Sequence, residues 1–206
     1  MSFAEFYKAD TQPIPGDERV LESWKTKAPG ITEFMHLYSG CSFSDGLYRV
    51  HALAEIDKWT SVCVGAFPKF EGRILCFASN WLGDQFALNA TRISGDNCLV
   101  SLFEAGTGKA LKIPETFLSF HDKELVEDRE AALGFSFFQK WRLSGGASPR
   151  RDQCVGYKQP LFLGGADEVD NLEMTDMEVY WTISAQLAAQ MRDLPVGTQI
   201  SGAKIV

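Results

Sequence analysis

Residues 73–105, RILCFASNWLGDQFALNATRISGDNCLVSLFEA, contain three β-rich runs that are separated by two short spacers, WLGD and SGDN. Both spacers contain Gly and Asp, which favour tight turns. Because short turns join antiparallel neighbours, we predict that this stretch forms a three-stranded antiparallel meander. A further β-rich run, KALKI at residues 109–113, is expected to add a fourth strand before Pro114.

Helical patterns precede the meander. Asp17 follows the helix-breaking sequence PIPG and is predicted to be the N-cap of a first helix. A second helix is predicted from apolar residues at helical spacing on one side: Ile31, Phe34, Met35 and Tyr38. The turn-forming pair Ser39-Gly40 is predicted to end it.

Helical patterns also follow the meander. Residues 116–143 are expected to be helical, and PLFLGG at residues 160–165 is expected to be a buried strand or an extended segment. The last helix is predicted to begin at a capping box in residues 175–178, to include Leu194 and to stop at Pro195.

Helices at both ends of an antiparallel meander indicate an α+β fold, with a central sheet flanked by N-terminal and C-terminal helices. A chain of 206 residues is long enough for one large domain or for two lobes in close contact. We expect residues 1–113 to form a lobe with the helix pair and the meander. Residues 114–206 are expected to form a helical lobe that packs with the first as one compact unit.

The composition argues against several classes of protein. A formal net charge of -7 disfavours nucleic-acid binding, which needs Lys and Arg at the phosphates. The five cysteines are scattered and include no CxxC pair, so we expect reduced thiols and no zinc site. The N-terminus lacks the apolar region of a signal peptide, and no run of about 18 apolar residues could span a membrane. We therefore expect a cytoplasmic protein without a membrane partner.

An acidic stretch, PLFLGGADEVDNLEMTD, lies at residues 160–176, and no Lys or Arg occurs from Gln159 to Met191. Asp176 and Glu178 fall in the predicted first helical turn, where carboxylates interact favourably with the helix dipole. Four acids precede that turn: Asp167, Glu168, Asp170 and Glu173. They belong either to a solvated loop without a partner or to a surface that binds a basic partner. A calcium loop counted from Asp167 would need Gly at its sixth position, where the chain has Leu172, so we expect no metal.

The sequence contains no catalytic signature. The three histidines, His36, His51 and His121, are far apart and form no HxxxH or HExxH motif. Cys41 is the one candidate nucleophile, and a thiol enzyme would need it beside His36 or His51. The stretch AGTGKA at residues 105–110 lacks the glycine spacing of a phosphate loop and is expected to be a hairpin turn.

Three segments together resemble a bacterial family. Residues 21–53, LESWKTKAPGITEFMHLYSGCSFSDGLYRVHAL, resemble the GAD-like module, and residues 77–89, FASNWLGDQFALN, resemble the central hairpin of SUKH-type domains. Residues 160–191 resemble the C-terminal module of type VI secretion immunity proteins, in which a P-x-x-LGG turn and an N-L pair precede an amphipathic helix containing Q-L.

This resemblance implies a non-enzymatic immunity protein with an α+β fold, no cofactor and no catalytic residues. Members of the family neutralise a cognate toxin, often a nuclease, that is encoded beside them. A nuclease carries a basic cleft for phosphates, and carboxylates can complement it. We expect Asp167, Glu168, Asp170 and Glu173 to contact the toxin, with Asp84 from the WLGD turn alongside, and to occlude its active site.

Two alternatives remain open at this point. A small-molecule-binding or regulatory cytosolic domain would have a deep apolar pocket. A thiol enzyme would have a reactive Cys41 close in space to a histidine.

Overall fold

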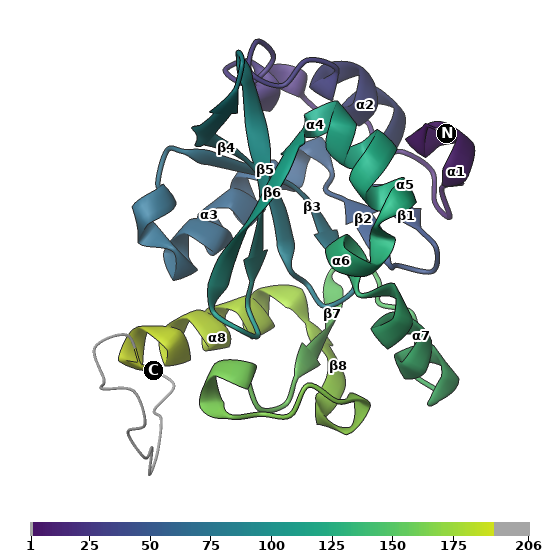
Figure 1. Cartoon of the computed structure of the whole chain (residues 1–206), viewed down its shortest axis with the longest axis vertical. Helices are drawn as coiled ribbons and strands as arrows, with labels where there is room; N and C mark the ends of the chain where they lie inside the picture. Colours follow the sequence, from purple (N-terminus) through teal and green to yellow (C-terminus); the bar gives the residue numbers. More distant parts are fainter. Residues whose placement is uncertain (1, 192–206) are drawn as a thin grey trace.

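Six strands form one antiparallel sheet in which each strand pairs with the next along the chain (Figure 1). The structure is a computed structural model and describes residues 2–191. In order the strands are β1 (Ser42–Phe43), β2 (Tyr48–Val50), β3 (Ile74–Asn80), β4 (Gln85–Ser94), β5 (Asn97–Glu104) and β6 (Lys109–Thr116). The predicted meander and its fourth strand are confirmed, and β1 and β2 extend the sheet on the β3 side.

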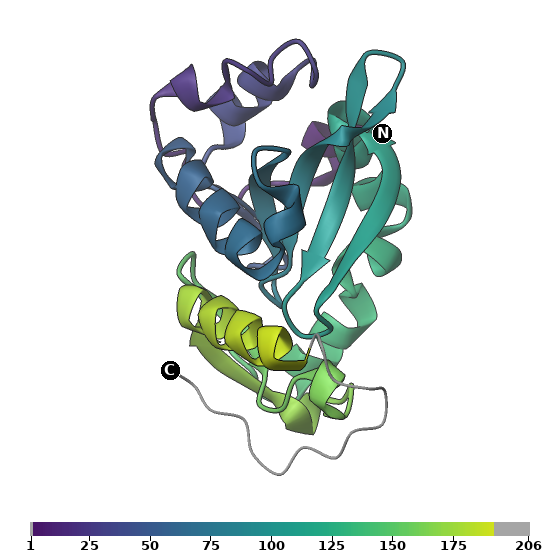
Figure 2. The same ribbon diagram turned by 90° about the vertical axis from the view of Figure 1, so that its left-hand side faces the viewer.

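Helices cover both faces of this sheet (Figure 2). On one face, α3 (Ile56–Ala66) packs against β3 and against α8 (Met177–Met191). On the other face lies the segment that follows β6, and α2 (Ile31–Tyr38) packs against its beginning, where Phe34 contacts Phe117. The α+β fold class is therefore confirmed. Within residues 2–191, no helix is long and apolar enough to cross a bilayer.

Alternating side chains of the central strands supply two separate cores. On one side of the sheet, Phe77 lies 5.1 Å from Phe117 and Phe86 lies 4.9 Å from Phe120, measured between ring centroids. On the other side, Cys76 belongs to a cluster with Trp59 of α3 and Trp181 of α8, among others. Because both faces are covered, every residue of β3 is buried, which explains the apolar run from Ile74 to Ala78.

The helical region after β6 is broken into short pieces, which the sequence did not predict. Its elements are α4 (Phe117–Ser119), a π-helical turn (Phe120–Glu124), α5 (Leu125–Glu127), α6 (Arg129–Leu133) and α7 (Phe135–Leu143). Gly134 separates the last two with a φ of 59°, a left-handed conformation that ends one helix and starts the next in a new direction. The remaining α-helix is α1 (Phe3–Phe6), and short 3-10 turns occupy Glu18–Leu21, Leu53–Glu55, Pro68–Phe70, Leu161–Leu163 and Val169–Asn171.

A two-stranded ribbon of β7 (Gln153–Tyr157) and β8 (Leu172–Asp176) precedes α8. The prediction of a strand or extended segment at PLFLGG is wrong, because Leu161–Leu163 form a 3-10 turn between the two strands. The predicted capping box is also wrong. Thr175 belongs to β8, and the carboxylate of Asp176 accepts the N–H of Val179 at 2.9 Å. The predicted end of this helix at Leu194 and Pro195 lies outside the described residues.

Hydrogen bonds attach this ribbon to one end of the sheet. The buried Arg49 of β2 donates to the backbone carbonyls of Arg150 (2.6 Å), Gln153 and Asn80 (2.7 Å). The indole N–H of Trp181 donates to the carbonyl of Gly83 in the β3–β4 turn at 2.8 Å. The bonds of Arg49 to Arg150 and Gln153 and the bond of Trp181 to Gly83 join segments on either side of residue 113, and the division into lobes at that residue stays a prediction.

Candidate partner-binding surface

Four of the five predicted contact residues lie together on the β7–β8 ribbon and its connecting loop. Asp167, Glu168 and Asp170 are on the loop and Glu173 is on β8, and all four are exposed. Within residues 2–191, no Lys or Arg forms an ion pair with any of them. We call Asp167–Glu173 the acidic loop. Its negative charge is exposed to solvent and unneutralised.

The acidic loop has a defined conformation that depends on Asn171. The Asn171 side-chain carbonyl accepts the backbone N–H of Gln159 at 3.0 Å, and its amide donates to the carbonyls of Gln159 (2.9 Å) and Ala166 (2.8 Å). A Cβ atom on Gly165 would lie 1.9 Å from the Gln159 carbonyl oxygen, so only glycine fits there. The LGG and N-L patterns in the sequence therefore have a structural reason.

Further contacts connect this loop to the rest of the fold. The hydroxyl of Tyr157 donates to the Asp167 carboxylate at 2.6 Å, and burial together with this carboxylate raises the pKa of Tyr157. The backbone N–H of Leu161 donates to the carbonyl of Gly106, in the β5–β6 turn, at 2.9 Å. The carboxylates are thus presented on a scaffold that is bonded to both the ribbon and the sheet.

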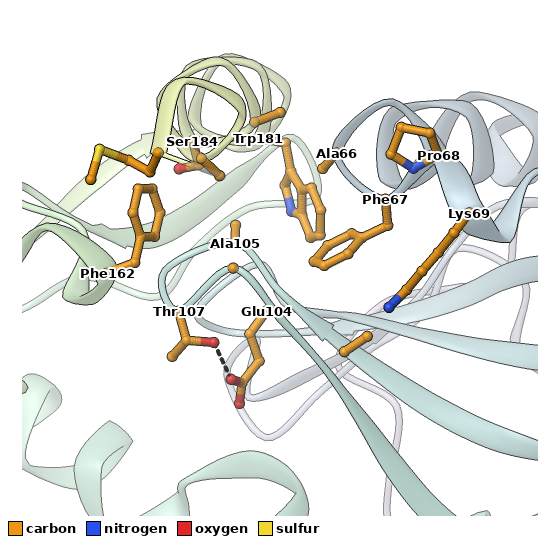
Figure 3. A pocket seen from close by; sticks show the side chains of 15 residues that line it. Ala66, Phe67, Pro68, Lys69, Glu104, Ala105, Thr107, Phe162, Trp181 and Ser184 are labelled. Atoms are coloured by element: carbon orange, nitrogen blue, oxygen red, sulfur yellow. Dashed lines mark hydrogen bonds between the residues drawn. The ribbon is translucent and has the colours of Figure 1, made fainter. Parts of the chain in front are cut away.

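A cavity of about 520 Å³ lies next to this scaffold, between α8, the end of α3 and the β5–β6 hairpin (Figure 3). Its aromatic lining consists of Phe67, Phe162 and Trp181. Glu104, also in the lining, accepts a hydrogen bond from the hydroxyl of Thr107 at 2.5 Å. The volume is within the range of small-molecule sites, but the lining includes the charged side chains of Lys69 and Glu104 and is not the purely apolar pocket that the ligand-binding alternative expects.

The structure places Asp84, the fifth predicted contact residue, inside the fold. Asp84 is only 7% exposed, and its carboxylate accepts the side-chain N–H of Asn80 at 3.0 Å. Burial, with a smaller contribution from the charge of Glu104, raises the pKa of Asp84 to about 7. Its carboxylate is therefore not on the surface with the other four.

Replacing Asp84 with Asn is expected to stabilise the fold at neutral and alkaline pH. The carboxyl of Asp84 ionises at its ordinary pKa in the unfolded chain and at about 7 in the folded protein. The wild type therefore loses stability as the pH rises between these two values, and it loses no further stability above about pH 7 from this group. The difference in free energy of unfolding between the variant and the wild type should widen by about 1.4 kcal/mol for each pH unit in that window. Urea unfolding at a series of pH values measures this difference.

Comparing Asp84→Asn with the wild type also removes a second effect of pH on stability, which has the opposite sign. Burial lowers the pKa of His51 and of His121 to about 3, so both histidines reduce stability as the pH falls below their ordinary pKa. Both proteins share that loss, and it cancels in the difference. A difference that stays constant from about pH 4 to about pH 7 would contradict the raised pKa of Asp84.

The thiol-enzyme alternative does not agree with the surroundings of Cys41. Cys41 is 1% exposed, and burial raises the pKa of its thiol, whereas a nucleophile needs a lowered one. The ring of His51 contacts Gln85 at 2.7 Å from Nε2 to Oε1, and His36 lies 3.9 Å from Glu18 on the surface. No hydrogen bond joins the Cys41 thiol to either ring. Among residues 2–191, no three His, Cys, Asp or Glu side chains form a group that could hold a metal.

Comparison with known proteins adds an independent observation on the segment that contains the acidic loop. Residues 115–188 match the family model of the T6SS immunity protein Tdi1, C-terminal. The match includes the β7–β8 ribbon and most of α8, and it supports a type VI secretion immunity protein. It does not reach residues 21–53 or 77–89, so the GAD-like and SUKH-type resemblances stay predictions. No curated protein matches the sequence.

The fold itself occurs in a solved structure. The crystal structure of Atu4351 from Agrobacterium tumefaciens superposes with a TM-score of 0.60 and 15% sequence identity. The superposition covers 88% of this chain and 86% of that chain. The two proteins therefore share their architecture over nearly the whole chain.

Proposed function

We propose that this protein is an immunity protein that binds and neutralises a type VI secretion toxin, and that this toxin is a basic nuclease. The observation that carries the proposal is the acidic loop: four exposed carboxylates that form no ion pair within residues 2–191, on a hydrogen-bonded scaffold inside the segment that matches the immunity family. A rigid surface loses little conformational entropy on binding, so more of its interaction energy appears as affinity.

The proposed mechanism is occlusion of the active site. A nuclease holds phosphates with Lys and Arg, and Asp167, Glu168, Asp170 and Glu173 would pair with these side chains in place of the phosphates. Charge complementarity also accelerates association, which favours capture of the toxin before it reaches DNA or RNA. We place this binding in the cytoplasm of the cell that makes the toxin. Because Asp84 is buried, we leave it out of the contact set.

Co-expression with the toxin encoded beside this chain tests the proposal. Cells that express the toxin alone should stop growing, and cells that also express this protein should grow. The purified pair should elute as a complex, while a toxin from an unrelated type VI system serves as the negative control for both measurements. Growth arrest that persists when both proteins are present and soluble would rule the proposal out.

The cavity beside α8 supports a second candidate, a domain that binds a small molecule, because its volume suits such a ligand. This candidate expects a cytosolic metabolite to raise the melting temperature of the isolated protein. If this candidate is correct, co-expression of this protein will not restore the growth of cells that express a neighbouring toxin. The co-expression experiment therefore separates the two candidates.

A further inference from the structure

The cavity between α8 and the β5–β6 hairpin combines aromatic walls with a carboxylate. The rings of Phe67 and Trp181 lie 6.3 Å apart between centroids at an interplanar angle of 63°, and Phe162 contributes a third ring from the β7–β8 connection (Figure 3). Glu104 comes from the hairpin side. Aromatic faces beside a carboxylate form an environment that binds organic cations.

The charge of Glu104 is not neutralised within the described part of the chain. Its carboxylate accepts the Thr107 hydroxyl, and no Lys or Arg among residues 2–191 lies within ion-pair distance of it. Lys69 also lines the cavity, and its ammonium lies 5.2 Å from the centroid of the Phe70 ring. Glu104 is close enough to the buried Asp84 to raise its pKa, so a second acidic group lies behind it. A cation that entered here would meet the carboxylate of Glu104, the one acidic side chain among the described residues of the lining.

One wall of the cavity comes from the same β7–β8 connection as the acidic loop. Phe162 belongs to the connection that leads from β7 into the acidic loop, and the neighbouring Leu161 bonds to Gly106 of the hairpin. A protein that contacts Asp167–Glu173 would therefore lie near the wall of the cavity that Phe162 forms. The same negative potential would act on both sites.

We propose that this cavity receives an arginine or lysine side chain of the toxin, an inference that rests on the proposed function. The methylene groups of such a side chain would pack against Phe67 and Trp181, and its charged end would reach Glu104. A purely apolar side chain would take Glu104 out of water without giving it a partner, which is unfavourable. An anionic group would be repelled by Glu104 and by the acidic loop.

Filling the cavity tests whether the toxin uses it. Ala188 lines the cavity and is half-buried, whereas Ala189 is exposed and absent from the lining. We expect Ala188→Trp to weaken toxin binding about 30-fold or more, because the indole would occupy the space of the incoming side chain. Ala189→Trp makes the same chemical change one residue further along α8 and should leave affinity unchanged. Equal affinities of both variants and the wild type would overturn the proposal.

Removing the charge tests the chemistry of the occupant. We expect Glu104→Gln to weaken binding about 10-fold, because a hydrogen bond between two charged groups becomes one with a neutral amide. Alanine substitution of each toxin Lys and Arg should reveal one residue whose loss is not additive with Glu104→Gln in a double-mutant cycle. If Ala188→Trp weakens binding but no basic toxin residue couples to Glu104, the occupant is not a cation and the proposal is overturned.

These results are distinguishable from failure of the proposed function itself. If the wild-type protein binds no neighbouring toxin, the proposed function fails and this inference fails with it. If the wild type binds and the cavity variants bind equally well, the immunity function stands and only the cavity assignment is lost. Melting temperatures of all variants confirm that each one is folded before its affinity is compared.

Discussion

Toxin binding is expected to weaken by about 100-fold or more at low ionic strength when Asp167, Asp170 and Glu173 are all replaced by lysine. Each replacement removes an attraction and adds a repulsion toward a basic surface. These side chains are exposed, so dissolved salt screens them and the loss should shrink as the salt concentration rises from about 0.03 M to about 0.3 M. Calorimetric titration at several salt concentrations measures both effects, and the association rate should fall together with the affinity.

A matched triple variant makes this result specific to the surface. Glu33, Asp96 and Glu127 are exposed acids outside the acidic loop and outside the lining of the cavity, and their replacement by lysine changes the net charge by the same amount. This control should bind almost as tightly as the wild type. If the two triple variants lose the same affinity, the effect comes from total charge, and if neither loses any, the toxin binds at a different surface.

Replacing Arg49 with Met is expected to lower the free energy of unfolding by about 3 kcal/mol. The guanidinium donates to three backbone carbonyls that have no other described side-chain donor, and each would lose a charged hydrogen bond worth roughly 1.5–3 kcal/mol. Burial lowers the pKa of Arg49 to about 10, which shows that the charge itself is costly to bury. Methionine carries no charge, so the variant avoids this cost of burial. The expected loss of stability is therefore smaller than the sum of three charged hydrogen bonds.

Urea unfolding measures the stability, and hydrogen exchange shows where it is lost. The backbone amides of β7 and β8 should exchange faster in Arg49→Met, because two of the lost bonds, to Arg150 and Gln153, attach this ribbon to the sheet. Arg73 is exposed and precedes β3, so Arg73→Met controls for the change in charge and side-chain length. Equal stability of the two variants would mean that Arg49 does not hold the ribbon.

The central sheet could be predicted from the sequence because its signals are local. The runs at residues 74–80, 85–94 and 97–104 are β-rich and are separated by turn-forming residues, and neighbouring strands in a meander are also neighbours in the chain. The ribbon could not be predicted in this way. β7 and β8 are short, and their connecting segment contains a 3-10 turn of apolar residues that has the composition of a buried strand.

The two turns of the meander show why the site was predicted only in part. The sequences WLGD and SGDN have similar turn chemistry, yet Asp84 is buried and Asp96 is exposed. They lie at opposite ends of the sheet, and the ribbon and α8 cover only the end with Asp84, where a Cβ on Gly83 would lie 2.8 Å from the Cβ of Cys154 (Figure 1). Burial by segments that are distant in the chain leaves no signal in the local sequence.

The cavity could not be predicted from the sequence either, because its lining residues come from segments that are far apart in the chain. Phe67, Glu104 and Trp181 are brought together only when α3, the hairpin and α8 pack. The role of Asn171 had a signal in the N-L pair that follows the LGG turn. The physical reason for that pattern became visible only when the three hydrogen bonds of its side chain were placed.

The bonds of Arg49 have a consequence for how this protein can evolve. Its guanidinium contacts main-chain oxygen atoms of Arg150, Gln153 and Asn80, and every amino acid supplies such an atom. The bonds to Arg49 therefore do not depend on which side chains these three positions carry. If the proposed function is correct, the charges of the acidic loop can change as the toxin changes, while these main-chain bonds keep the ribbon on the sheet.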